Sequence, residues 1–212
     1  MKYTLLKKDH IQIIHPLTGK PVRLYRIYAL KKFQTVYGLV PANSVGGYIQ
    51  DESNLPQNDA SWVFNLGKVY DEAVLGDSAV CHEGQVFGEA MVVETLVTNN
   101  ARIFGNAIVI DSEIKDKCEI YNKAHVTNAI MFNSSVICDH AKVKNVEMTG
   151  GSRIADNATV NNSKLTFGVQ VSKDAHLENC KFEGVFTIFE GKHLNETRTH
   201  YPDIKISNAA AV

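Results

Sequence analysis

Three histidines in this sequence are spaced at multiples of 17 residues. His125, His176 and His193 lie 51 and 17 residues apart, so a fold with that period would place them in one column. Imidazole binds metals and exchanges protons near neutral pH, which makes the column a candidate metal site or proton-transfer site. The alternative interpretation is a set of exposed polar residues on a strand. A metal would need a third ligand, and we predict no metal site.

Two further histidines fall where the same period predicts turns. His82 and His140 are candidate bases in a shallow groove, or else ordinary surface turn residues. His10, His15 and His200 lie outside the periodic region and indicate little.

The apolar residues follow the same period and must form the elements that position these histidines. They fall into three columns separated by steps of 6, 6 and 5 residues, which add up to 17. The first column is Val69, Val86, Ile103, Ile120, Ile137, Ile154, Val171 and Ile188; the second is Leu75, Val92, Val109, Val126, Val143, Val160, Leu177 and Leu194; the third is Val63, Val80, Val97, Ile114, Met131, Met148, Leu165 and Phe182. A repeat of this kind predicts a stack of coils, each buried against its neighbours.

Small and turn-forming residues occupy fixed places between the columns. Seven alanines, from Ala73 to Ala175, each follow the first column by four places. Two places after the second column come acidic residues and then an asparagine series, which predicts a ladder of hydrogen-bonded amides: Asn128, Asn145, Asn162 and Asn179. One large and one small residue per step of about six resembles the hexapeptide repeat of left-handed parallel β-helices. We therefore expect an all-β, three-sided, left-handed parallel β-helix with 17-residue coils.

Four aromatic residues form another column, one place after the first apolar column. Tyr70, Phe87, Phe104 and Tyr121 are expected to stack on one outer edge. The column is either covered by a cap or is an interface between copies of the chain, with Phe87 and Phe104 in the contact. Trp62, Leu96 and Ile130 form a second outward apolar column. We predict self-association as a dimer or trimer.

The two ends of the chain depart from the period. Residues 1–44 contain two strand-like segments around the turn PLTGKP, which predicts an N-terminal β-hairpin that caps the helix. The β-helix is expected over residues 45–194, and residues 195–212 are expected to form a C-terminal cap or tail.

The segments LYRIYALKKF, VGGYIQDESNLPQ and SWVF, followed by the alanine-spaced repeats, resemble the YdcK-like proteins of bacteria and phage over roughly residues 23–190. Tyr48 and Pro56 depart from that group, where tryptophan and serine are common. The resemblance implies a hexapeptide acyltransferase that uses acetyl-CoA and a histidine general base at a subunit boundary. His125, His176 and His140 are the candidate bases. However, the period runs from residue 63 to 194 without an insertion, so the projecting loop typical of such sites is missing.

Composition excludes several other classes. The net charge is −1 and the basic residues are dispersed, which disfavours nucleic-acid binding. No apolar run is long enough for a membrane span, and the N-terminus lacks a signal-peptide core. The four cysteines lack CxxC spacing, so we expect reduced thiols and a cytoplasmic protein without membrane partners.

Two functions remain open from the sequence. The first is a non-catalytic, self-associating β-solenoid without a cofactor, which presents a flat face or the aromatic edge to a protein or carbohydrate partner. The second is the acetyl-CoA-dependent acyltransferase.

Overall fold

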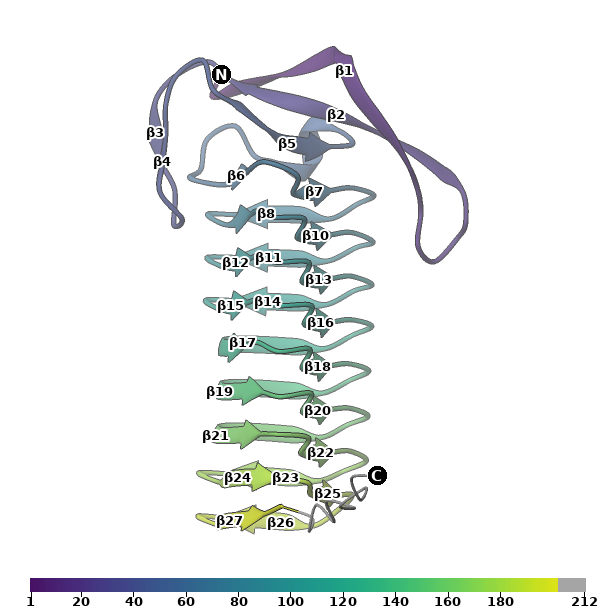
Figure 1. Cartoon of the computed structure of the whole chain (residues 1–212), viewed down its shortest axis with the longest axis vertical. Helices are drawn as coiled ribbons and strands as arrows, with labels where there is room; N and C mark the ends of the chain where they lie inside the picture. The colour runs from purple at the N-terminus through teal and green to yellow at the C-terminus, as the bar shows by residue number, and fades with distance from the viewer. Residues whose placement is uncertain (202–212) are drawn as a thin grey trace, which may run out of the picture.

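The computed structural model describes residues 1–201, which form a parallel β-helix of about nine coils with 17-residue spacing. Figure 1 shows the coils stacked as a column, with two hairpins at the N-terminal end. This part of the chain contains no α-helix; a single 3-10 turn, η1 (Glu52–Asn54), precedes the second coil. The fold class predicted from the repeat is confirmed.

Each coil contributes strands to three faces, which we number in the order in which the chain visits them. The first face consists of β5 (Val45–Ile49), β7 (Lys68–Val69), β10 (Gln85–Val86), β13 (Arg102–Ile103), β16 (Glu119–Ile120), β18 (Val136–Ile137), β20 (Arg153–Ile154), β22 (Gln170–Val171) and β25 (Thr187–Ile188).

The second and third faces join into one continuous sheet because three long strands run through both. The second face contains β8 (Val74–Gly76), β11 (Met91–Val93), β14 (Ile108–Ile110), β23 (His176–Glu178) and β26 (Lys192–Leu194). The third contains β6 (Trp62–Val63), β9 (Ala79–Val80), β12 (Leu96–Val97), β15 (Glu113–Ile114), β24 (Lys181–Gly184) and β27 (Thr197–His200). The strands shared by both are β17 (His125–Met131), β19 (Lys142–Thr149) and β21 (Thr159–Thr166).

Neighbouring coils pair in register, so each apolar column fills the interior along the axis. Val86 pairs with Ile103, and Val92 pairs with Val109, one coil further on. These side chains are fully buried, as is the corner alanine Ala107. Each large inward side chain contributes roughly 1.5–3 kcal/mol of burial.

The corner between the second and third faces is built from residues in the left-handed conformation, as the asparagine column predicts. Asn128 and Asn145 have φ angles of 51° and 54°, which asparagine tolerates better than most residues. Their amides form the expected ladder: Asn128 Nδ2 donates to Asn145 Oδ1 at 2.9 Å, and Asn145 Nδ2 donates to Asn162 Oδ1 at 2.7 Å. Asn162 Nδ2 donates instead to Glu178 Oε1, so Asn179 does not continue the ladder.

A buried hydroxyl ladder lies just inside the same corner. The backbone N–H of Thr95 donates to Ser78 Oγ at 3.1 Å, and that of Ser112 donates to Thr95 Oγ1 at 3.2 Å. Ser112 Oγ in turn accepts from the N–H of Ala129 at 3.0 Å. These hydroxyls satisfy backbone groups that the bend would otherwise bury without a partner.

The N-terminal residues form two hairpins. β1 (Tyr3–Ile14) and β2 (Pro21–Ala29) pair antiparallel, and β2 pairs antiparallel with β5, so the predicted hairpin cap extends the first-face sheet. A second hairpin, β3 (Phe33–Gln34) with β4 (Leu39–Val40), was not expected from the sequence. In Figure 1 the two hairpins bend down along different sides of the stack.

The last coil is one residue short, which corrects the predicted register. Leu177 pairs with His193, so Leu194 is not in the second apolar column; its side chain is 45% exposed. β27 pairs with β24 and extends the third face to His200, beyond the predicted end of the β-helix at residue 194. The rest of the predicted C-terminal cap or tail, residues 202–212, lies outside the described residues.

Candidate functional site

The structure does not bring the candidate catalytic histidines together. His125 on β17 and His176 on β23 share an outward column but are separated by Lys142 and Thr159. Three coil steps correspond to about 14 Å. His140 lies in the neighbouring column and is exposed, as is His125.

His193 leaves the predicted histidine column altogether. Because the last coil is shortened, His176 pairs with Lys192 and His193 occupies the position opposite Leu177. The His193 ring lies 6.4 Å from the ring of Phe182, and its Nδ1 is 3.0 Å from Glu196 Oε1. Among residues 1–201 no group of three or more His, Cys, Asp or Glu side chains is arranged to hold a metal ion.

The cysteines are not candidate nucleophiles. All four are unpaired and buried. Burial raises the pKa of Cys118 to about 12, and burial also leads the rise in the pKa of Cys138 to about 11. These thiols are therefore protonated at neutral pH, whereas the thiolate is the nucleophilic form.

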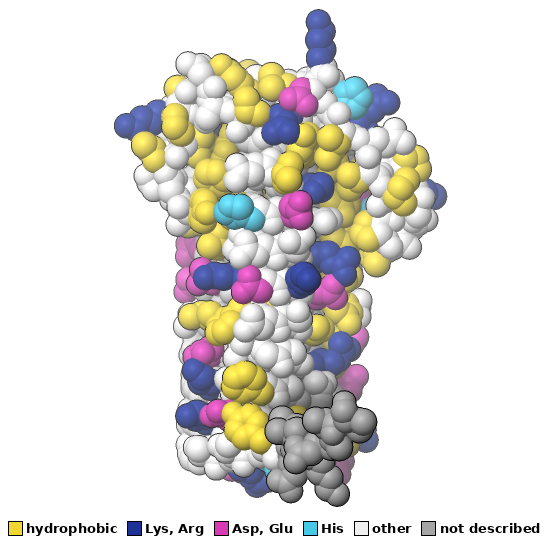
Figure 2. All heavy atoms as spheres, in the orientation of Figure 1, with side chains coloured by type: hydrophobic (Ala, Val, Ile, Leu, Met, Phe, Trp, Pro, Cys, Tyr) yellow, Lys and Arg dark blue, Asp and Glu magenta, His cyan; other side chains and the backbone are white. Residues whose placement is uncertain are grey.

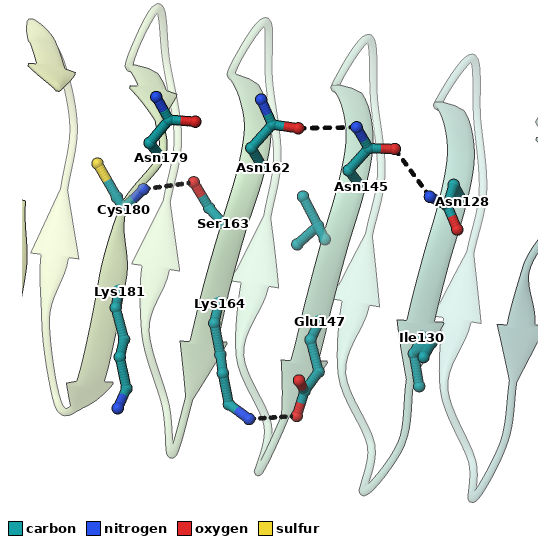
Figure 3. A pocket seen from close by; sticks show the side chains of 11 residues that line it. Asn128, Ile130, Asn145, Glu147, Asn162, Ser163, Lys164, Asn179, Cys180 and Lys181 are labelled. Atoms are coloured by element: carbon teal, nitrogen blue, oxygen red, sulfur yellow. Dashed lines mark hydrogen bonds and ion pairs between the residues drawn. The ribbon is translucent and has the colours of Figure 1, made fainter. Parts of the chain in front are cut away.

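An open groove of about 630 Å³ lies at the corner between the second and third faces. Figure 3 shows its asparagine ladder beside Lys164 and Glu147, whose Nζ and Oε1 atoms are 2.6 Å apart. Ile130 and Lys181 also line it. The lining residues include no histidine, so the groove offers hydrogen bonds but no imidazole base.

The aromatic column forms a continuous stack on the first face. The ring centroids of Tyr70, Phe87, Phe104 and Tyr121 are 4.9 Å apart at each step, with neighbouring rings within 10° of parallel. The predicted stacking is therefore confirmed.

The β1–β2 hairpin covers the N-terminal half of this stack. Tyr70 and Phe87 are fully buried in a cluster with Leu24 and Tyr48. Phe104 and Tyr121 remain half-buried. Burial raises the pKa of the Tyr70 hydroxyl. At Tyr70 and Phe87 the hairpin supplies the cap that the sequence left open as the alternative to an interface, while Phe104 and Tyr121 keep part of their surface exposed within the described chain.

His15 joins the β1–β2 hairpin to the aromatic stack, a role that was not predicted from the sequence. Its ring packs edge-on against Tyr70 and Phe87, with centroid distances of 5.7 and 5.6 Å. Its Nδ1 accepts from the backbone N–H of Leu17, so Nε2 carries the proton and donates to Asp71 Oδ2 at 2.9 Å. The only signal in the sequence was its position beside the turn PLTGKP.

The β3–β4 hairpin covers the third face at the same end. The Phe33 ring lies 5.3 Å from Trp62, and the Tyr37 ring lies 5.2 Å from Phe64. Trp62 is consequently 1% exposed, whereas Ile130, in the same outward column four coils further on, is 47% exposed.

Among residues 1–201, no segment covers the second face in this way. Val74, Met91 and Ile110, on β8, β11 and β14, are 39%, 50% and 37% exposed. Val93 and Ile108, which lie among them, are half-buried. Figure 2 shows a different side of the molecule, where charged side chains of both signs mix below the hairpins. The uncovered second face is thus a flat apolar surface on rigid strands, and we take it as the candidate binding site.

No known family profile matches the chain, and no curated protein matches it. No helix in the described residues is long and apolar enough to cross a membrane. The proposed function therefore rests on the surface of the chain itself.

Proposed function

We propose that this protein is a non-catalytic β-solenoid that works by association, with the second face as its docking surface for a protein. The observation that carries the proposal is the selective cover of the coils nearest the N-terminus. Two of the three faces are buried there by hairpins of the same chain, and the third presents Val74, Met91 and Ile110 to solvent.

The shape of the face supports a protein ligand. Its outward side chains alternate along straight strands with parallel neighbours, so they form a flat and rigid surface. Flat apolar patches with polar margins are typical of protein–protein contacts, whereas small molecules are bound in concave sites. A carbohydrate would find more hydrogen-bonding groups in the asparagine-lined groove.

Acyl transfer is the competing function, and it would rest on the resemblance to YdcK-like proteins. The candidate bases His125 and His140 are exposed and His176 is half-buried, and none of the three lines the groove. A base acts only within hydrogen-bond reach of the proton it removes, in a site that orients both substrates. Thermal unfolding with acetyl-CoA tests this function: we expect no shift in the melting temperature. A rise that His176→Ala or His125→Ala abolishes would favour the enzyme.

Photo-cross-linking in the cells that make the protein tests the docking face. A cross-linking residue at Met91 is expected to give a discrete protein adduct, formed with another copy or with a different protein. The same residue at Lys117, which is exposed on another corner, serves as the control. Excess wild-type protein should compete the adduct away, and the folded double variant Met91→Glu, Ile110→Glu should not. Equal labelling from both positions would contradict the proposal.

A further inference from the structure

The charge on the second face changes along the helix axis. Its outward residues form three columns, and one margin column changes sign from the N-terminal to the C-terminal coils. This margin column reads Glu72, Glu89, Asn106, Lys123 and His140. The central column reads Val74, Met91, Ile108, His125 and Lys142, and the other margin reads Gly76, Val93, Ile110, Thr127 and Lys144.

The charges of this face are not neutralised within the described chain. Glu72, Glu89, Lys123, Lys142 and Lys144 are all exposed, and none forms an ion pair among residues 1–201. Glu89 Oε2 accepts a hydrogen bond from the neutral amide of Asn106 at 2.6 Å. On the third face, by contrast, Lys115 forms an ion pair with Glu113 and Lys164 forms one with Glu147.

The basic residues gather on the C-terminal coils of the face. His125 pairs in register with Lys142, Lys144 lies two residues further along the same strand, and Lys123 and His140 are neighbours in the margin column. Two carboxylates of these coils have other partners: Asp139 accepts from Asn122 Nδ2 at 2.8 Å and from the N–H of Asp156, and Glu178 accepts from Asn162. A ligand with acidic groups would complement the lysines of this region.

From this pattern we propose that the second face binds the second face of another copy, with the two helix axes antiparallel. The proposal rests on the proposed function and names its partner. A two-fold axis that crosses the face at β14 places each margin column opposite its own reversed copy. Glu89 then faces the partner's Lys123, and Glu72 faces the partner's His140.

The same axis also matches the apolar part of the face. Ile108 and Ile110 meet their own counterparts at the centre, as a two-fold contact requires. Met91 and Val74 lie opposite the partner's His125 and the partner's Lys142, whose side chains have apolar stems that pack over them while the charged ends reach outward.

The parallel arrangement is disfavoured by the same charges. A two-fold axis along the helix direction would set Lys142 against the partner's Lys142, and it would leave Glu89 and Lys123 without an opposite charge. Juxtaposed like charges suppress an arrangement by several kcal/mol. Only the antiparallel pairing opposes acidic with basic residues on this face.

The area of the contact predicts a weak dimer. Overlap from β8 to β19 covers five rungs, or about 24 Å by about 20 Å, which is roughly 480 Å² on each copy. This lies at the low end of specific interfaces. We therefore expect a concentration-dependent equilibrium between monomer and dimer that salt shifts toward monomer.

Sedimentation velocity of the full chain over a concentration series tests the arrangement by charge exchange. Glu89→Lys and Lys123→Glu should each raise the dimer dissociation constant about tenfold or more, because each creates two like-charge contacts. The double variant Glu89→Lys, Lys123→Glu restores opposite charges and should return to within about threefold of wild type. Lys117→Glu makes the same charge change on another corner and should leave dimerisation unchanged.

Several outcomes would overturn the arrangement. A monomer at every concentration would do so, as would a dimer that the single reversals leave intact or that the double variant does not recover. Equal melting temperatures across the set verify that the variants are folded. If the chain stays monomeric while a cross-linker at Met91 captures a different protein, this inference fails and the proposed function stands. If neither association is found, both fail.

Discussion

Phe87 and Met91 lie four residues apart on the same coil, yet their side chains have opposite surroundings. Phe87 on the first face is fully buried beneath the β1–β2 hairpin, while Met91 on the second face is 50% exposed. Both point away from the helix interior. The comparison teaches that the repeat decides which residues face inward, but that the N-terminal hairpins decide which outward residues are buried.

The contrast has a functional consequence. The cover on the first face includes stacked rings, a histidine and a carboxylate, all supplied by the chain itself. The second face keeps its apolar residues and an unbalanced set of charges exposed. Exposed apolar surface costs free energy in water unless a partner covers it, so the difference between the faces supports the proposal that the second face is where association occurs.

The largest expected effect on stability comes from truncating one covered and one uncovered outward residue. Phe87→Ala removes a ring stacked between Tyr70 and Phe104 and should lower the free energy of unfolding by about 3–5 kcal/mol. Met91→Ala should change it by no more than about 0.5 kcal/mol, because Met91 lies on the surface and is 50% exposed. Urea unfolding of dilute protein measures both. Equal losses would contradict the difference in cover between the two faces.

The next effect concerns Lys2 and Asp59, whose ion pair joins the start of β1 to the segment before β6. Lys2 Nζ donates to Asp59 Oδ1 at 2.9 Å and to the Ser61 carbonyl at 2.8 Å, and its side chain is 2% exposed. Asp59→Asn removes the negative charge from this pair. We expect a loss of about 1.5–3 kcal/mol at neutral pH, the range for a hydrogen bond to a charged group.

The loss should depend on pH. Burial acts to raise the pKa of Asp59, but hydrogen bonds from Ser61, Lys2 and the backbone of Asp77 outweigh it and hold the pKa below its ordinary value. A carboxyl whose pKa is lowered on folding stabilises the protein above its unfolded pKa of about 3.9, and that contribution is lost as the pH falls through the folded value. Melting temperatures of wild type and Asp59→Asn should therefore converge as the pH falls below about 3.9. Glu52→Gln, an exposed carboxylate nearby, is the control; a gap that does not change with pH would show that the charge is unimportant.

A smaller difference in stability is expected between variants at an inward and an outward residue of the second face. Ala141 is fully buried at a corner, so Ala141→Leu should overpack the coil and cost about 1–3 kcal/mol. Lys142 is exposed, and Lys142→Leu should stay within about 0.5 kcal/mol of wild type. Thermal unfolding at low concentration distinguishes them. Equal melting temperatures would mean that the inward and outward positions of this coil are misassigned.

The candidate site was only partly visible in the sequence. The outward positions on each coil followed from the period, including the aromatic column and the column that holds His125 and His176. Their exposure did not follow, because β3–β4 and the path of β1–β2 depend on contacts such as those of Phe33 with Trp62 and of His15 with Tyr70. These residues lie far apart in the chain and share no periodic spacing.

The sequence by itself determined the coil. Each coil requires a large apolar residue at three positions and an alanine four places after the first of them, and these local requirements repeat until the register is unambiguous. The tertiary structure alone decided the one-residue shift that turns His193 inward, the hairpin cover that buries Phe87, and the bare face around Met91. A repeat specifies how each coil packs on the next coil. Which outward side chains are buried depends instead on where the non-repeating hairpins lie, because burial is a property of the whole surface.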